Sequence, residues 1–138
     1  MIKTETTTID GKNFKVTQLG YGDGVELLTK LLSIAGSAFE KTEDKESFSL
    51  GRLASNLKAN DLRMVIEKFA QRTLIEREPG SDKWPKLEPE VDLAGDYNLM
   101  FKWLKFALEV NYGGFFSAGG VLEKNGTFLG LTKKVHAA

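Results

Sequence analysis

Residues 4–17 read TETTTIDGKNFKVT, two short runs of strand-forming residues on either side of an Asp-Gly pair. The first run, residues 4–9, is mostly threonine and ends in isoleucine, and β-branched residues favour extended backbone. Asp10 and Gly11 tolerate the positive φ values that a two-residue hairpin turn requires. The stretch therefore predicts an N-terminal β-hairpin in which the first run pairs with residues 14–19.

The side chains of this hairpin should separate into two faces, because successive residues of a strand point to opposite sides. One face is expected to hold Thr7, Ile9, Phe14 and Val16, and the other Thr6, Thr8, Lys15 and Thr17. The first face can pack, whereas the second meets water. Since the packing face must be covered, we expect an α+β fold in which the hairpin packs on a bundle of about four helices.

Apolar residues recur at helical spacing after the hairpin and predict the first of these helices over residues 24–39. Asp23 and Glu26 resemble a capping box at its start. Two neighbouring apolar stripes give this helix a wide apolar face, so it should lie between two other layers. The stripes are Val25, Leu28, Leu32, Ala35 and Phe39, and Leu27, Leu31, Ile34 and Ala38.

Two further helices are predicted in the middle of the chain. Apolar spacing indicates a short helix over residues 50–57. Asn60 or Asp61 can cap the next helix, which has one apolar face. That face consists of Leu62, Val65, Ile66 and Phe69.

A strand, a loop and a long helix are predicted after it. Residues 73–77 should add a third strand, and the prolines at 79, 85 and 89 make the following stretch a loop. Residues 93–110 have few polar positions, so they are expected to form the central helix of the domain. The tryptophan of this helix, Trp103, is expected in the core.

Length and composition limit the class of protein to which the chain can belong. The chain has 138 residues, the usual size of one domain, so we expect a single domain over residues 1–138. Residues 117–138 contain several glycines and are expected to be a C-terminal tail that can stay mobile. The absence of cysteine and of a long apolar run is typical of a cytoplasmic protein with no membrane span.

The net charge of the chain limits which partners it can attract. Nineteen basic and nineteen acidic residues give a formal net charge of zero, which provides no field to attract nucleic acid or an acidic membrane. A net charge near zero also favours weak self-association. Lys102 and Lys105 flank Trp103, as in sites that stack on single strands, but a core role for Trp103 is the better interpretation.

No motif predicts a catalytic, metal or cofactor site. The single histidine, His136, lies three residues from the C-terminus, where nothing orients a general base. Residues 40–46 hold four carboxylates in a charged linker without the spacing of a calcium loop. The glycines at 20–24 lack the Lys-Ser/Thr of a phosphate-binding loop. We therefore expect no enzyme activity.

The order of the predicted elements, together with one short motif, resembles the tail assembly chaperones of long-tailed bacteriophages. The likeness covers most of residues 5–116, and its most specific part is the closing helix followed by Asn-Tyr-Gly-Gly-Phe-Phe at 111–116. The resemblance implies a non-enzymatic protein of the host cytoplasm. Its implied partners are the tape-measure protein, which such chaperones bind, and the tail-tube protein, whose polymerisation they promote.

Aromatic residues are the candidates for contact with a partner: Tyr112, Phe115, Phe116 and Trp84. Adjacent residues point in different directions in a helix or a strand, so one of Phe115 and Phe116 should anchor in the domain and the other face a partner. A kink at the preceding glycines would let both rings enter the core. Two other classes stay open. One is a structural virion component, such as a minor tail or baseplate protein, or another protein-interaction module, and the other is a small enzyme with dispersed carboxylates.

Overall fold

The computed structural model describes the backbone of residues 1–41 and 57–116 and the side chains of residues 1–34 and 57–114. The predicted short helix at 50–57 and the predicted tail at 117–138 fall almost wholly outside these residues. The elements are β1 (Thr4–Ile9), β2 (Lys12–Thr17), α1 (Tyr21–Lys41), α3 (Ala59–Ala70), β3 (Thr73–Glu76), the π-helical turn η2 (Pro89–Leu93) and α4 (Tyr97–Phe116). This is the predicted α+β class.

The sheet is antiparallel with strand order β1-β2-β3. In the β1–β2 hairpin Ile9 pairs with Lys12 and Thr7 with Phe14. Asp10 and Gly11 form the turn with φ values of 51° and 80°, the conformation of a two-residue type I′ hairpin turn. The predicted hairpin, its turn and its face assignment are confirmed, but the second strand is Lys12–Thr17 instead of residues 14–19, because the two-residue turn sets Lys12 opposite Ile9. The predicted third strand joins the free side of β2.

One face of the sheet is buried and the other is polar. Phe14, Val16 and Ile75 are fully buried, and the helices cover this side. On the opposite face Thr4 and Thr17 share a hydrogen bond of 2.8 Å between their hydroxyls. Each strand thus contributes its alternate residues to the core, as the period of two requires.

The two edges of the sheet differ. On the outer side of β3, the Ile75 N–H donates to the Pro85 carbonyl (2.8 Å) and the Leu87 N–H to the Thr73 carbonyl (3.0 Å). The loop predicted from its prolines therefore covers this edge. No such segment pairs with the outer side of β1 among the residues that the structure describes.

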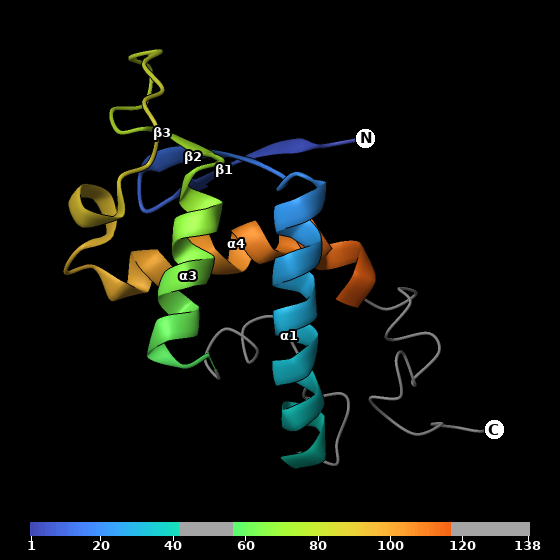
Figure 1. Cartoon of the computed structure of the whole chain (residues 1–138). Helices are drawn as coiled ribbons and strands as arrows, with labels where there is room; N and C mark the ends of the chain where they lie inside the picture. Colours follow the sequence, from blue (N-terminus) through green and yellow to red (C-terminus); the bar gives the residue numbers. More distant parts are fainter. Residues whose placement is uncertain (42–56, 117–138) are drawn as a thin grey trace.

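Helix α4 supplies the centre of the core, as predicted. It contacts β1, β2, α3 and η2, and Figure 1 shows it crossing behind α1 and α3 below the sheet. Its fully buried residues are Leu99, Trp103, Leu104, Ala107 and Leu108. The Trp103 Nε1–H donates to the Thr73 hydroxyl at 3.3 Å.

The predicted bounds of this helix are wrong at both ends. At its start, residues 89–93 form a separate π turn, and Gly95 has a φ of 80°, which ends that turn. Asp96 then accepts a hydrogen bond from the Leu99 N–H at 3.1 Å and starts α4. At its end, α4 runs through Gly113 and Gly114 to Phe116. Each glycine disfavours the helix by about 1 kcal/mol, and the tertiary contacts of Asn111 and Tyr112 offset this cost.

Helices α1 and α3 lie side by side and antiparallel (Figure 1). Lys68 near the end of α3 pairs with Asp23 (3.0 Å) and Glu26 (3.6 Å) at the start of α1. Lys30 pairs with Asp61 at 3.3 Å. The capping box predicted from Asp23 is therefore wrong, because α1 already begins at Tyr21 and both carboxylates face a lysine.

The buried sides of these helices confirm most of the predicted apolar pattern where side chains are described; the predicted Ala35, Ala38 and Phe39 lie outside the described side chains. Leu27, Leu31 and Leu32 of α1 are buried, but Val25 is 46% exposed, so the first turns of α1 are not enclosed between two layers of described residues. In α3 the predicted face is buried, with Leu62 half-buried. Its predicted cap is wrong, because the N-cap is Lys58, which makes no side-chain capping bond.

One carboxylate of the sheet makes stability depend on pH. Hydrogen bonds from Asn13 Nδ2 and from the Asp82 N–H, both 2.8 Å, hold the pKa of Glu76 below its ordinary value. Because the folded-state pKa is depressed, Glu76 contributes its full stability above its ordinary pKa of 4.5, the value of the unfolded chain. It is lost as the pH falls through the lower folded value.

Urea unfolding at neutral and acidic pH tests this expectation. The free energy of unfolding of the unmodified chain should decline on acidification. That of Glu76→Gln should decline less. Glu78→Gln, a change at an exposed residue in the loop just after β3, serves as the control and should follow the unmodified chain. An identical decline in Glu76→Gln and the unmodified chain would contradict the assignment.

Candidate partner-binding site

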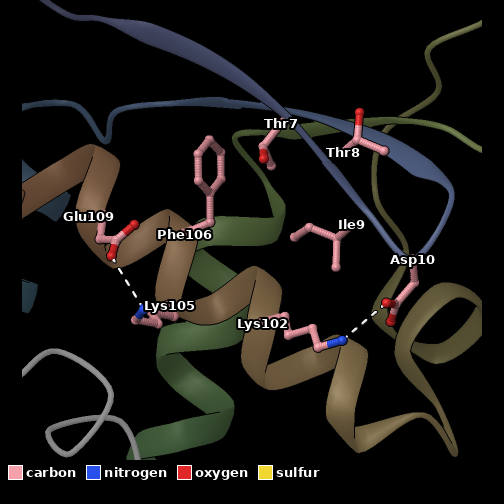
Figure 2. Close-up of a pocket in the computed structure, with 8 residues that line it drawn as sticks. All are labelled: Thr7, Thr8, Ile9, Asp10, Lys102, Lys105, Phe106 and Glu109. Carbon is pink, nitrogen blue, oxygen red and sulfur yellow. Dashed lines mark hydrogen bonds and ion pairs between the residues drawn. The ribbon is translucent and has the colours of Figure 1, made fainter.

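A groove runs between the edge strand β1 and helix α4. It consists of two hollows of about 410 and 440 Å³ that share Phe106 and Glu109. The first is lined by Thr7–Asp10 and by α4 residues from Lys102 to Glu109 (Figure 2). The second continues to Lys3 and Gly114. We call the two hollows together the β1–α4 groove.

The floor of the groove is apolar, and the charged residues that line its first hollow are paired. Ile9, Phe106 and Val110 are partly buried against the core, and Figure 2 shows the Phe106 ring rising from α4 towards β1. Two ion pairs flank this floor, Lys102 with Asp10 at 3.1 Å and Lys105 with Glu109 at 3.7 Å. Such a surface can take apolar side chains of a partner without leaving a strong charge unpaired.

Tyr112, a predicted partner-binding residue, is 8% exposed. Its hydroxyl donates to the Gly24 carbonyl in the first turn of α1 at 2.8 Å, and burial raises the pKa of this hydroxyl. The residue therefore fastens α4 to α1. Its contact with a partner stays a prediction.

The neighbours of Tyr112 complete a polar junction between α4 and the end of β2. The Leu19 N–H donates to Asn111 Oδ1 and Gln18 Nε2 donates to the Val110 carbonyl, both at 2.8 Å. Arg72 donates through Nε and Nη2 to the Gln18 carbonyl at 3.1 and 2.9 Å. The asparagine and tyrosine of the motif at 111–116 thus have a structural role that its sequence did not reveal.

The other predicted partner residues lie apart from this junction. Phe115 and Phe116 form the end of α4, and their side chains are outside the described part of the chain, so the division of labour between them stays a prediction. Trp84 is half-buried in the loop after β3, and Lys15 Nζ lies 4.4 Å from its ring centroid. Lys15 is on the polar face of the sheet, so the structure does not bring Trp84 and Tyr112 together.

Three exposed aromatic residues were not predicted as surface features. Tyr21 begins α1, and Tyr97 and Phe101 begin α4. The spacing of four residues between Tyr97 and Phe101 puts them on one face of their helix. This spacing could have indicated an exposed aromatic face, but the apolar residues all around this segment concealed it. Phe106 is partly buried against the core and also lines the groove.

The buried carboxylates are fully engaged. Burial raises the pKa of Asp92, but hydrogen bonds from Arg77 at 2.6 and 2.9 Å and from the Glu88 N–H at 2.8 Å outweigh burial and leave this pKa lowered. Within residues 1–34 and 57–114, His, Cys, Asp and Glu form no group of three or more that could hold a metal ion. In the same part of the chain, no helix has the length and apolarity needed to span a membrane.

These features define a small α+β domain in which helices cover one face of a three-stranded sheet and a groove follows its open edge. The model of the phage tail assembly chaperone proteins, TAC, matches residues 10–123. The chain belongs to this family, which confirms the predicted resemblance, and membership implies protein partners in tail assembly. Searches among curated proteins and among solved structures found no match.

Proposed function

We propose that this protein is a non-enzymatic chaperone that binds the tape-measure protein of its phage and promotes assembly of the tail tube around it. The observation that carries the proposal is the match of residues 10–123 to the tail assembly chaperone family. The protein acts in the host cytoplasm, where tail parts are made, and it associates weakly with itself. The balanced charge of the chain favours that association.

The β1–α4 groove is the best candidate for contact with the tape-measure protein. Its apolar floor around Phe106 offers a pocket for a buried anchor residue, and the flanking ion pairs supply a polar rim. Apolar contact of this kind suits a chaperone, because it shields a long partner from aggregation without any covalent chemistry.

Co-expression with the tape-measure protein of the same phage tests the proposal. We expect the chaperone to keep the tape-measure protein in solution and to co-purify with it. Phe106→Ala should weaken the complex by at least about tenfold, the loss typical of a central interface residue. Phe101→Ala removes an exposed aromatic ring from the same helix outside the groove lining, so it is the matched control and should bind normally.

Two results would contradict the proposal. In the first, the tape-measure protein neither becomes soluble nor co-purifies with the chaperone. In the second, mass spectrometry of purified phage particles finds the protein at stoichiometric amounts, which would make it a structural virion component instead. Normal binding by Phe106→Ala would leave the family role intact and exclude the groove.

A further inference from the structure

The outer side of β1 carries a row of backbone groups that have no partner among the described residues. Ile9 and Lys12 close the hairpin, and in an antiparallel pair every second residue exchanges hydrogen bonds with the neighbouring strand. The intervening residues, Thr4, Thr6 and Thr8, therefore turn their N–H and C=O groups away from β2. None of these backbone groups makes a hydrogen bond to any residue that the structure describes.

Apart from the charge of Glu5, this edge has few of the devices that usually block strand addition, and no described residue covers it. Proteins protect edges with proline, lysine, bulges or a covering segment. Between residues 4 and 9 there is no proline and no lysine, and the register with β2 is continuous without a bulge. All three threonines are exposed. The edge is thus ready to accept another strand.

We propose that β1 pairs with β1 of a second copy of this chain, antiparallel and about a two-fold axis at Thr6. The two three-stranded sheets would then form one continuous sheet. The inference rests on the self-association included in the proposed function and assigns a surface to it. Two-fold pairing at this residue places the helices of both copies on the same face of the joined sheet.

Charge complementarity selects the second copy as the occupant. The strand is flanked by Lys3 at its start and Asp10 at its end. Antiparallel pairing about Thr6 sets Lys3 of each copy opposite Ile9 of the other and so near Asp10, whose carboxylate also pairs with Lys102 of its own chain at 3.1 Å, whereas parallel pairing would bring like charges together. A chain with zero formal net charge adds no long-range repulsion to this contact.

The side chains also specify the register. With the axis at Thr6, Thr4 lies opposite Thr8 of the second copy and the two Thr6 residues face each other, and threonine pairs stabilise neighbouring strands. Glu5 then lies opposite Thr7. A shift by two residues in one direction would set Glu5 against Glu5, and the opposite shift would set it against Ile9, which an ionised carboxylate does not favour.

Disulfide trapping tests both the pairing and its register, because the chain contains no cysteine. Directly opposed residues of this kind have Cα atoms about 5.5 Å apart, within the usual range of a disulfide. Under mild oxidation Thr6→Cys should form a covalent dimer. Thr4→Cys and Thr8→Cys should cross-link efficiently only when mixed. Thr29→Cys, at an exposed threonine of α1, controls for random collision and should form no covalent dimer.

Sedimentation of the full chain gives an independent measurement. Thr6→Lys places two like charges opposite each other at the axis and should weaken self-association by at least about tenfold, whereas Thr29→Lys should not. Thr6 is exposed and its side chain has no hydrogen bond in the described structure, so the variant should fold. Circular dichroism checks this.

The outcomes separate this inference from the proposed function. Self-association that survives Thr6→Lys, or cross-linking of Thr29→Cys equal to that of Thr6→Cys, would overturn the β1 interface and leave weak association itself intact. A strictly monomeric chain would overturn both. If Thr6→Lys instead abolishes co-purification with the tape-measure protein and the chain is monomeric, β1 receives a strand of that partner and the second copy is excluded.

Discussion

Replacing Trp103 with alanine should lower the free energy of unfolding by about 3–5 kcal/mol, the range for a large aromatic side chain removed from a core. Trp103 is fully buried in α4. Its ring nitrogen donates to the Thr73 hydroxyl, which in turn donates to the Phe69 carbonyl at 2.8 Å. The residue therefore joins α4 to both β3 and α3, and its loss leaves a cavity where these elements meet.

The second tryptophan of the chain provides a matched control. Trp84 is half-buried, and its identified contact is with the Lys15 ammonium group. A cation–π contact at the surface contributes about 0.5–1 kcal/mol, so Trp84→Ala should cost about 1 kcal/mol. Urea unfolding followed by circular dichroism measures both variants without relying on tryptophan fluorescence.

A third variant keeps the test informative if Trp103→Ala does not fold. Trp103→Phe retains most of the ring but loses the hydrogen bond to Thr73 and should give an intermediate loss of stability. Equal small losses for Trp103→Ala and Trp84→Ala would show that α4 is not the centre of the core.

Replacing Asn111 with alanine should cost about 1–3 kcal/mol, because it leaves the backbone N–H of Leu19 without its acceptor in a partly buried site. Asn111 also donates from Nδ2 to the Ala107 carbonyl at 2.9 Å, which fixes its orientation. The contact connects the β2–α1 link to the last turns of α4. Its loss should therefore loosen the end of α4 as well as lower the overall stability.

Asn98→Ala is the control for this change. Asn98 lies exposed in the same helix, so the substitution removes the same side chain without breaking the junction, and alanine has the higher helix propensity. Thermal melts of the two variants should differ clearly, and hydrogen exchange should quicken near residues 110–114 only in Asn111→Ala. Equal melting temperatures would refute the junction.

The hairpin and its faces could be predicted because their causes are local. The positive φ values of Asp10 and Gly11 and the alternation of residues in β1 and β2 depend on immediate neighbours. The buried face of α3 and the central place of Trp103 could also be predicted, since helical spacing reveals which side of a helix is apolar.

The ends of the helices and most of the candidate site could not be predicted in the same way. Helix α4 continues through Gly113 and Gly114 because Tyr112 bonds to Gly24 and Asn111 to Leu19, partners about 90 residues away in the chain. The capping box at Asp23 was wrong because Lys68 of α3 takes its carboxylate. Neither partner is visible in a local window of sequence.

The sequence by itself determined the α+β class, the hairpin, the buried helix faces and the resemblance to tail assembly chaperones, since these depend on backbone preferences and on periodicity along the chain. Tertiary structure alone decided that the loop after β3 covers one edge of the sheet, that no described residue pairs with the outer side of β1, and that Phe106 lines a groove beside it. The physical reason is that an edge or a groove exists only between segments distant in the sequence, and the packing of the whole core sets their approach.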